Sequence, residues 1–299
     1  MLGQTAALTM EEGEAPMAVW IDGIVRADDD AKVSVSDHGF TVGDGVFETA
    51  KVTGGTVVAL SRHLRRLARS AAALGLRPID EDQVRAGVAA VLSGTEIPDP
   101  GRLRITYTGG VAPLGSDRGD AGPTLVVALA AARPWPPSAA AVTVQWTRNE
   151  RSAVAGVKTT SYAENVVALA YARGRGASEA IFANTRGGLC EGTGSNVFAV
   201  YGDRVVTPPL SSGCLAGITR ELFLEWSADS TPSGVKSVEE TDLPLAELRG
   251  ADEVFLTSAT RDVQPLHQLD GRALPGAGGP ISRSCADHFV ARITATPDP

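Results

Sequence analysis

The spacing of apolar residues in the first 130 positions follows two different periods. Apolar and polar residues alternate in several short stretches, which predicts strands with one buried face. These stretches are residues 17–26, 32–40, 46–60 and 102–110, and the third turns at Gly54 and Gly55 as a hairpin. Residues 61–76 and 80–94 instead repeat apolar residues every three or four positions, which predicts helices. The pattern predicts a small α+β domain over residues 17–130.

The remainder of the chain alternates strand-like and helix-like stretches. Strands are predicted at residues 141–147, 179–184, 196–209 and 253–259, and helices at residues 161–176, 217–227 and 281–295. This alternation predicts a larger α/β domain over residues 142–299. Three prolines within residues 131–141 predict a linker, and residues 1–16 are expected to form a loose tail. A cleft between two such domains is a common place for a small-molecule site.

The charge and composition of the chain argue against two kinds of partner, nucleic acids and membranes. The net charge of −8 and the pI of about 5.1 argue against binding to nucleic acid, which needs a surplus of Lys and Arg. The longest apolar run, residues 124–132, is about half of the roughly 18 residues that suggest a membrane span. Residues 1–16 lack the basic start and apolar stretch of a signal peptide, so we expect a cytoplasmic protein.

Cysteine and histidine positions point away from a disulfide framework and from a metal site. The three cysteines, Cys190, Cys214 and Cys285, are widely spaced, which fits reduced thiols. The four histidines show no pair at ligand spacing, so no bound metal is predicted.

Lys158 is one of only four lysines in a chain with 27 basic residues. It stands between a strand-like segment and a predicted helix, and Thr159, Thr160 and Ser161 are candidates to cap that helix. A lysine that loses its proton in a desolvated cleft is a nucleophile that forms Schiff bases with aldehydes. The alternative is a solvated loop lysine.

Glu191 is a second candidate, because its neighbours are small. Gly192 and Gly194 would let a ligand ring approach the carboxylate closely. If that ring were pyridoxal phosphate, Glu191 would keep its pyridine nitrogen protonated. The alternative is a tight turn with an exposed glutamate.

Three further segments suit a phosphate group. Gly213 and Gly217 precede a helix that starts near Ile218, where free N–H groups and the helix dipole favour an anion. Hydroxyl groups at a predicted strand end come from Thr257, Ser258 and Thr260. An arginine of residues 61–76 is a further candidate, and the sequence pattern does not separate Arg66 from Arg62, Arg65 and Arg69.

In this order, the segments resemble the class IV aminotransferase family, fold type IV of the pyridoxal-phosphate enzymes. The resemblance rests on five motifs: DHGFTVGDGVFETAKV at 37–52, HLRRL at 63–67, VKTTSYAENV at 157–166, EGTGSNVF at 191–198, and GITRE at 217–221 with TSATRDVQPLHQLDG at 257–271. The family includes branched-chain aminotransferases, D-amino acid aminotransferases and 4-amino-4-deoxychorismate lyases.

The resemblance implies two α/β domains with pyridoxal 5'-phosphate in the cleft between them, a small-molecule amino substrate and a homodimer. It implies that Lys158 binds the cofactor as a Schiff base and transfers protons, and that Glu191 pairs with the pyridine nitrogen. It implies that Arg66 holds the phosphate with the backbone of Ile218 and Thr219. Relatives often carry a threonine where this chain has Ala259, which leaves Ser258, Thr260 or backbone N–H groups for that contact.

Two reactions fit this family. The residues in these motifs most resemble those of lyases that convert 4-amino-4-deoxychorismate to p-aminobenzoate and pyruvate in folate biosynthesis. This is the reaction that we hypothesise. The alternative is a class IV transaminase acting on branched-chain or D-amino acids. Thr108 stands where D-amino acid transaminases tend to carry a carboxylate-binding arginine, and the candidates in its place are Arg104, Arg118 and backbone groups. A third hypothesis, a non-catalytic small-molecule binder, would not need both Lys158 and Glu191.

Overall fold

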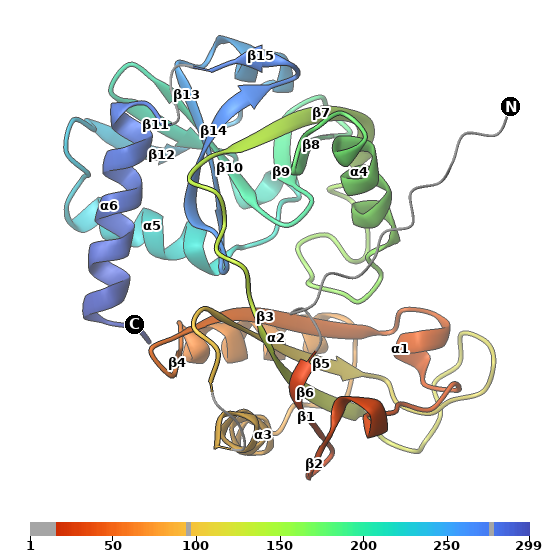
Figure 1. Cartoon of the computed structure of the whole chain (residues 1–299). Helices are drawn as coiled ribbons and strands as arrows, with labels where there is room; N and C mark the ends of the chain where they lie inside the picture. The colour runs from red at the N-terminus through yellow and green to blue at the C-terminus, as the bar shows by residue number, and fades with distance from the viewer. Residues whose placement is uncertain (1–15, 94–96, 275–277) are drawn as a thin grey trace, which may run out of the picture.

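The computed structural model describes residues 16–93, 97–274 and 278–299, so most of the predicted N-terminal tail lies outside it. Two sheets, one above the other, form the two halves of the molecule, and β7 leads from the lower half into the upper one (Figure 1). No helix in the described ranges is long and apolar enough to cross a membrane.

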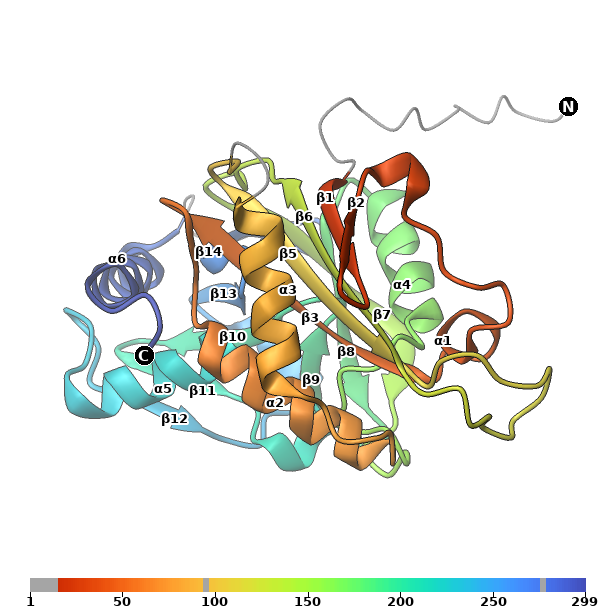
Figure 2. The same cartoon turned by 90° about the horizontal axis from the view of Figure 1, so that it is seen from below.

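The small half is built on a six-stranded antiparallel sheet with strand order β2-β1-β6-β5-β3-β4. Helices α2 and α3 pack across its outer face (Figure 2). Its elements are β1 (Pro16–Ile21), β2 (Ile24–Arg26), η1 (Asp28–Asp30), α1 (His38–Thr41), β3 (Gly45–Thr53), β4 (Thr56–Val57), α2 (Leu60–Ala73), α3 (Glu81–Ser93), β5 (Gly101–Thr108) and β6 (Thr124–Ala131).

Successive side chains along β3 and β5 point to opposite faces of this sheet, and the two faces pack against different parts of the molecule. Val46 and Ala50 of β3, with Leu103 and Ile105 of β5, are buried in a core against the two helices. The intervening residues, such as Phe47, face the opposite way and line the space toward the other half. The small sheet therefore has a core face and a cleft face.

The large half is built on a nine-stranded mixed sheet, with order β12-β11-β10-β13-β14-β7-β8-β9 and β15 beside β14. Its strands are β7 (Ala139–Arg148), β8 (Glu179–Asn184), β9 (Leu189–Gly192), β10 (Asn196–Tyr201), β11 (Arg204–Thr207), β12 (Ser237–Glu240), β13 (Glu253–Ser258), β14 (Asp262–Leu269) and β15 (Arg272–Ala273). Its helices are α4 (Ala163–Arg173), η2 (Leu210–Ser212), α5 (Ile218–Asp229), η3 (Leu245–Gly250) and α6 (Pro280–Ala295).

An aromatic cluster joins this sheet to α5 and α6. The rings of Phe198 and Phe255 stack with centroids 4.9 Å apart, and Phe223 of α5 meets both edge-on. Phe289 of α6 is buried in the same core. This packing fixes the position of α5, whose first turn reaches the space between the halves.

The C-terminal end of the chain lies against the small half. The backbone N–H of Ala59 donates to Pro297 O at 2.7 Å, and Asp298 accepts from the backbone and side chain of Ser61 at 2.8 and 2.7 Å. Arg62 of α2 pairs with Glu221 and Glu225 of α5. These contacts hold α2 of one half beside α5 of the other.

All five long predicted helices are present, and residues 46–60 form the predicted hairpin. The prediction of an alternating strand-like segment at residues 32–40 was wrong. Within this segment the structure has an isolated bridge from Asp37 to Val111 and the start of the short helix α1, and the apolar Val33 and Val35 are exposed. The predicted domain boundaries stay predictions; β7 begins at Ala139, inside the segment predicted as a linker.

Replacement of Phe255 by alanine should destabilise the large half strongly. The ring is fully buried between two other phenylalanines, so its removal leaves a cavity and should lower the free energy of unfolding by about 3–5 kcal/mol. Chemical denaturation of the variant would measure this loss, with Val290→Ala on the exposed side of α6 as a near-neutral control. A loss below about 1 kcal/mol would contradict the packing.

Candidate active site

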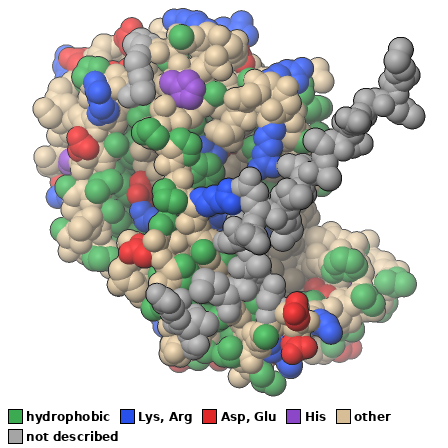
Figure 3. Space-filling model, in the orientation of Figure 1, with side chains coloured by type: hydrophobic (Ala, Val, Ile, Leu, Met, Phe, Trp, Pro, Cys, Tyr) green, Lys and Arg blue, Asp and Glu red, His purple; other side chains and the backbone are tan. Residues whose placement is uncertain are grey.

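A cavity of about 500 Å³ lies between the two halves and brings together segments that are far apart in the sequence. Six of the seven predicted site residues line it: Arg66, Lys158, Glu191, Ile218, Ser258 and Thr260. Thr219, one residue inside α5, is buried and is not among the lining residues. On the face shown in Figure 3, Lys and Arg side chains gather near the middle of the molecule, where the halves meet.

The Lys158 segment belongs to the large half but is bound to β3 of the small half. The backbone N–H of Phe47 donates to Lys158 O at 3.0 Å, and that of Thr160 donates to Gly45 O at 2.8 Å. The hydroxyls of Thr160 and Ser161 both donate to Gly43 O. The prediction that these hydroxyls cap the following helix was therefore wrong, since they attach the segment to the small half and α4 has no side-chain cap.

The Lys158 side chain lies in the cavity beside aromatic rings. Its Nζ is 4.4 Å from the ring centroid of Phe47 and 5.9 Å from that of Tyr162. Burial, with the nearby Arg66 charge, lowers the pKa of Lys158 to about 8. An appreciable fraction of this amine is therefore neutral and nucleophilic near neutral pH.

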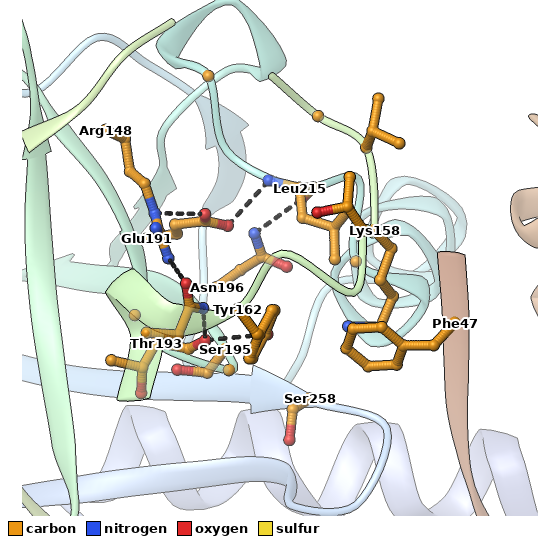
Figure 4. Close-up of a pocket in the computed structure, with 18 of the residues that line it drawn as sticks. Phe47, Arg148, Lys158, Tyr162, Glu191, Thr193, Ser195, Asn196, Leu215 and Ser258 are labelled. Carbon is orange, nitrogen blue, oxygen red and sulfur yellow. Dashed lines mark hydrogen bonds and ion pairs between the residues drawn. The ribbon is translucent and has the colours of Figure 1, made fainter. Parts of the chain in front are cut away.

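Glu191 lies on β9 across the cavity from Phe47 and Lys158 (Figure 4). Its Oε2 accepts a hydrogen bond from the backbone N–H of Leu215 at 2.9 Å, and its Oε1 is 3.1 Å from Nε of Arg148. Burial raises the pKa of Glu191, and Arg148 and the Leu215 N–H offset part of this rise. The alternative of an exposed turn is excluded, because Glu191 is in a strand and its side chain is only 15% exposed.

Arg66 is held in place by a buried carboxylate. Its Nε and Nη2 donate to the two oxygens of Glu48 at 2.7 and 2.6 Å, and Nη1 donates to Ala216 O at 2.8 Å. His63 contacts Glu48 at 2.7 Å. Burial alone would raise the pKa of Glu48, but Arg66 and His63 outweigh it and lower this pKa to about 2. Arg66 is thus pre-oriented, and two of its five N–H donors remain for an anion.

The structure separates Arg66 from the other arginines of α2. Within this fully described helix, Arg66 alone lines the cavity, whereas Arg65 and Arg69 are exposed and Arg62 binds the two glutamates of α5. The first turn of α5 opens on the same cavity at Gly217 and Ile218. A Cβ at Gly217 would lie 2.0 Å from Oδ1 of Asn196, so only glycine fits this approach.

Arg104 also projects into the cavity, from the cleft face of β5. Its guanidinium carbon is 3.5 Å from the ring centroid of Phe47, and among the described residues it forms no ion pair. The side chain is exposed to the open cavity, yet the surrounding walls reduce its hydration and lower its pKa to about 10. It remains charged at neutral pH, without a carboxylate partner.

The sequence analysis missed Arg148 and Glu48. The alternation along β3 contained a signal for Glu48, because it falls on the apolar face between Val46 and Ala50. A carboxylate on a core face needs a cation, and Arg66 of α2, which packs on this face, supplies it. Arg148 had no comparable signal, since its partners come from α4 and β9.

The model of the protein family amino-transferase class IV matches residues 45–269 of this chain. The chain belongs to this family. It is 33% identical over 281 residues to a Methanocaldococcus jannaschii protein provisionally named a branched-chain-amino-acid aminotransferase, covering 91% of this chain and 95% of that one. A D-alanine aminotransferase of Listeria monocytogenes is 29% identical over 296 residues, with 93% and 96% covered.

A crystal structure supports the same relationship. The branched-chain aminotransferase from Thermoproteus uzoniensis with norvaline superposes with a TM-score of 0.85 at 28% identity, covering 94% of this chain and 95% of the other. The fold is therefore that of the fold type IV pyridoxal-phosphate enzymes, as the motifs predicted. Enzymes of this family use pyridoxal phosphate, act on small amino and keto substrates, and are commonly dimers.

The residues in the cavity fit pyridoxal phosphate. A lysine with a lowered pKa suits an aldehyde, a buried carboxylate suits a pyridine nitrogen, and Arg66 with the start of α5 suits a phosphate. Ser258 and Thr260 lie at the end of β13 on the same cavity. The chain thus offers a matching group for each polar part of the cofactor.

The pH dependence of cofactor attachment should reveal the lowered pKa of Lys158. Only the neutral amine attacks an aldehyde, so the rate of covalent attachment to the apoprotein should rise with pH and level off above about 8. Rapid-mixing absorbance would measure the rate, and borohydride reduction followed by peptide mass spectrometry would identify the site. A rate that still rises steeply from pH 9 to 11 would contradict the assignment, as would attachment in Lys158→Ala.

Proposed function

We propose that this protein is a pyridoxal-phosphate-dependent aminotransferase that moves amino groups between amino acids and 2-oxo acids. The observation that carries the proposal is one cavity in which Lys158, with its lowered pKa, lies across from Glu191, buried beside Arg148. The family match and the aminotransferase names of the similar proteins support the same reaction. A non-catalytic binder would not need such a lysine.

The proposed roles follow from the positions of the side chains. Bound pyridoxal phosphate supplies an electron sink for the bonds at the substrate carbon. Lys158 would anchor the cofactor, and its amine would move a proton at the substrate carbon. Glu191 holds the pyridine nitrogen, and Arg66 holds the phosphate together with the first turn of α5. Thr219, Ser258 and Thr260 remain proposed phosphate contacts, through backbone or hydroxyl groups.

Arg104 is our proposed ligand for a substrate carboxylate. It is charged, lacks an ion-pair partner among the described residues and faces the cavity that contains Lys158. Arg118, the other candidate, is bound by both oxygens of Asp44 at 2.7 and 2.6 Å and by the carbonyls of Leu74 and Gly75. Its donors are thus largely occupied, which favours Arg104.

The lyase hypothesis receives less support than the transaminase alternative. The named relatives reported above are aminotransferases, and neither lyase activity nor folate biosynthesis enters their names. We also propose a homodimer in the cytoplasm, on the basis of the family and the sequence.

A direct comparison on one purified sample tests the reaction. We expect keto acid formation from a panel of L- and D-amino acids with 2-oxo acid acceptors, and no rapid release of p-aminobenzoate from 4-amino-4-deoxychorismate. Lys158→Ala should lose several orders of magnitude in rate. Rapid p-aminobenzoate and pyruvate release with slow amino transfer would instead establish the lyase.

Replacement of Arg104 by methionine should weaken substrate binding without loss of the cofactor. The loss of a charged hydrogen-bond partner should raise KM for carboxylate substrates by about tenfold or more. Arg102→Met is the matched control, because Arg102 lies two residues earlier on β5 and does not line the cavity. Equal KM values in both variants would reject this role for Arg104.

A further inference from the structure

Arg148, the last residue of β7, is fixed by three different segments. Its Nε contacts Glu191 Oε1 at 3.1 Å, its Nη1 pairs with Glu164, and its Nη2 donates to Asn165 Oδ1 at 2.9 Å. The guanidinium carbon is 4.1 Å from the ring centroid of Phe182, which pairs directly with Glu191 across β8 and β9. The side chain is only 14% exposed, so it has little freedom to move away from Glu191.

The single charge of Arg148 is divided between two carboxylates in different environments. Glu191 is buried at 15% exposure, whereas Glu164 on the first turn of α4 is 51% exposed. The exposed carboxylate is solvated by water, and the buried one depends on Arg148 and the Leu215 N–H. A change at Glu164 therefore alters how strongly the Arg148 charge stabilises the ionised form of Glu191.

Other titratable groups surround Glu191 but leave Arg148 as its closest cation. They are Lys158, Tyr162, Cys190 and Cys214. Burial raises the pKa of Tyr162 and of both thiols, so these groups stay neutral near neutral pH. Lys158 has a pKa of about 8, so it is mostly charged at neutral pH and becomes neutral above that value. Arg148 is the permanent positive charge at this carboxylate.

A carboxylate and a pyridine nitrogen that share one proton can hold it on either atom. A cation next to the carboxylate favours the ionised carboxylate, and therefore the protonated nitrogen. Without that cation, burial favours the neutral acid, and the nitrogen would only accept a hydrogen bond. The electron sink is effective only in the first arrangement.

We propose that Arg148 is a positioning residue that keeps Glu191 ionised, and thereby keeps the ring nitrogen of the bound cofactor protonated, with Glu164 moderating its effect. This inference rests on the proposed pairing of Glu191 with the ring nitrogen. It is independent of which amino acid or reaction the enzyme uses.

The test follows the ¹⁵N resonance of the ring nitrogen in holoenzyme loaded with ring-labelled pyridoxal phosphate, as a function of pH. Arg148→Met removes the charge, Arg148→Lys retains it, and Glu164→Gln leaves more of the Arg148 charge to Glu191. Glu191→Gln provides the signal of a nitrogen without its carboxylate. Unfolding temperatures and cofactor affinities of all variants separate a change in protonation from a folding defect.

We expect the ¹⁵N resonance at neutral pH to move toward the position of an unprotonated nitrogen in Arg148→Met, because the shared proton passes to the carboxylate, and to move less in Arg148→Lys. In Glu164→Gln the resonance should stay at, or move further toward, the position of a protonated nitrogen. Since Glu164 is half exposed, this variant tests the proposal even if Arg148→Met fails to fold.

Three results would overturn the proposal. One is a wild-type ¹⁵N titration in a folded, cofactor-bound Arg148→Met. Another is a Glu164→Gln resonance displaced toward the position of an unprotonated nitrogen, in the direction expected for loss of Arg148. The third is an unchanged nitrogen in Glu191→Gln, which would reject the underlying pairing itself while leaving the proposed transaminase reaction open to its own assay.

Discussion

The attachment of the Lys158 segment to β3 is the constraint on which the site depends. Two backbone hydrogen bonds, from Phe47 to Lys158 and from Thr160 to Gly45, extend the edge of the small sheet with a strand-like piece of the large half. The segment from the large half carries Lys158, and β3 carries Phe47, whose ring lies beside the Lys158 amine. A relative movement of the halves would therefore displace the Lys158 amine, so the cavity and this amine are fixed together.

The buried carboxylates Glu48 and Glu191 near the cavity each have a cation in contact, whereas the cations Lys158 and Arg104 lack a carboxylate within the described part of the chain. Glu48 is matched by Arg66 and His63, and Glu191 by Arg148 and a backbone N–H. Lys158 and Arg104 have no carboxylate in contact among the described residues. The first responds with a lowered pKa, and the second keeps its charge because a guanidinium is far harder to deprotonate. One is thereby suited to nucleophilic attack and the other to binding an anion.

Local patterns predicted the helices and most strands, because each long helix has its own apolar face. They failed at residues 32–40, where alternation existed but no partner strand did, and at the hydroxyls after Lys158, which bond across the cleft rather than along the chain. The motifs predicted Lys158, Glu191 and Arg66 as a set, and all three line one cavity. The residues that set their charges, Glu48 and Arg148, act through contacts between distant segments that no local pattern contains.

The cofactor machinery by itself does not distinguish an amino transfer from a lyase reaction. Both reactions would use the proposed lysine, ring contact and phosphate site, and they differ in what leaves the substrate. Substrate choice must then depend on the remaining walls of the cavity, chiefly the cleft face of the small sheet. There Thr49, Thr106 and Arg104 lie on the same face as Phe47, and the single guanidinium among them is the strongest polar group. If Arg104 binds the substrate carboxylate as proposed, its position relative to Lys158 would orient the amino-bearing carbon and so influence which reaction follows.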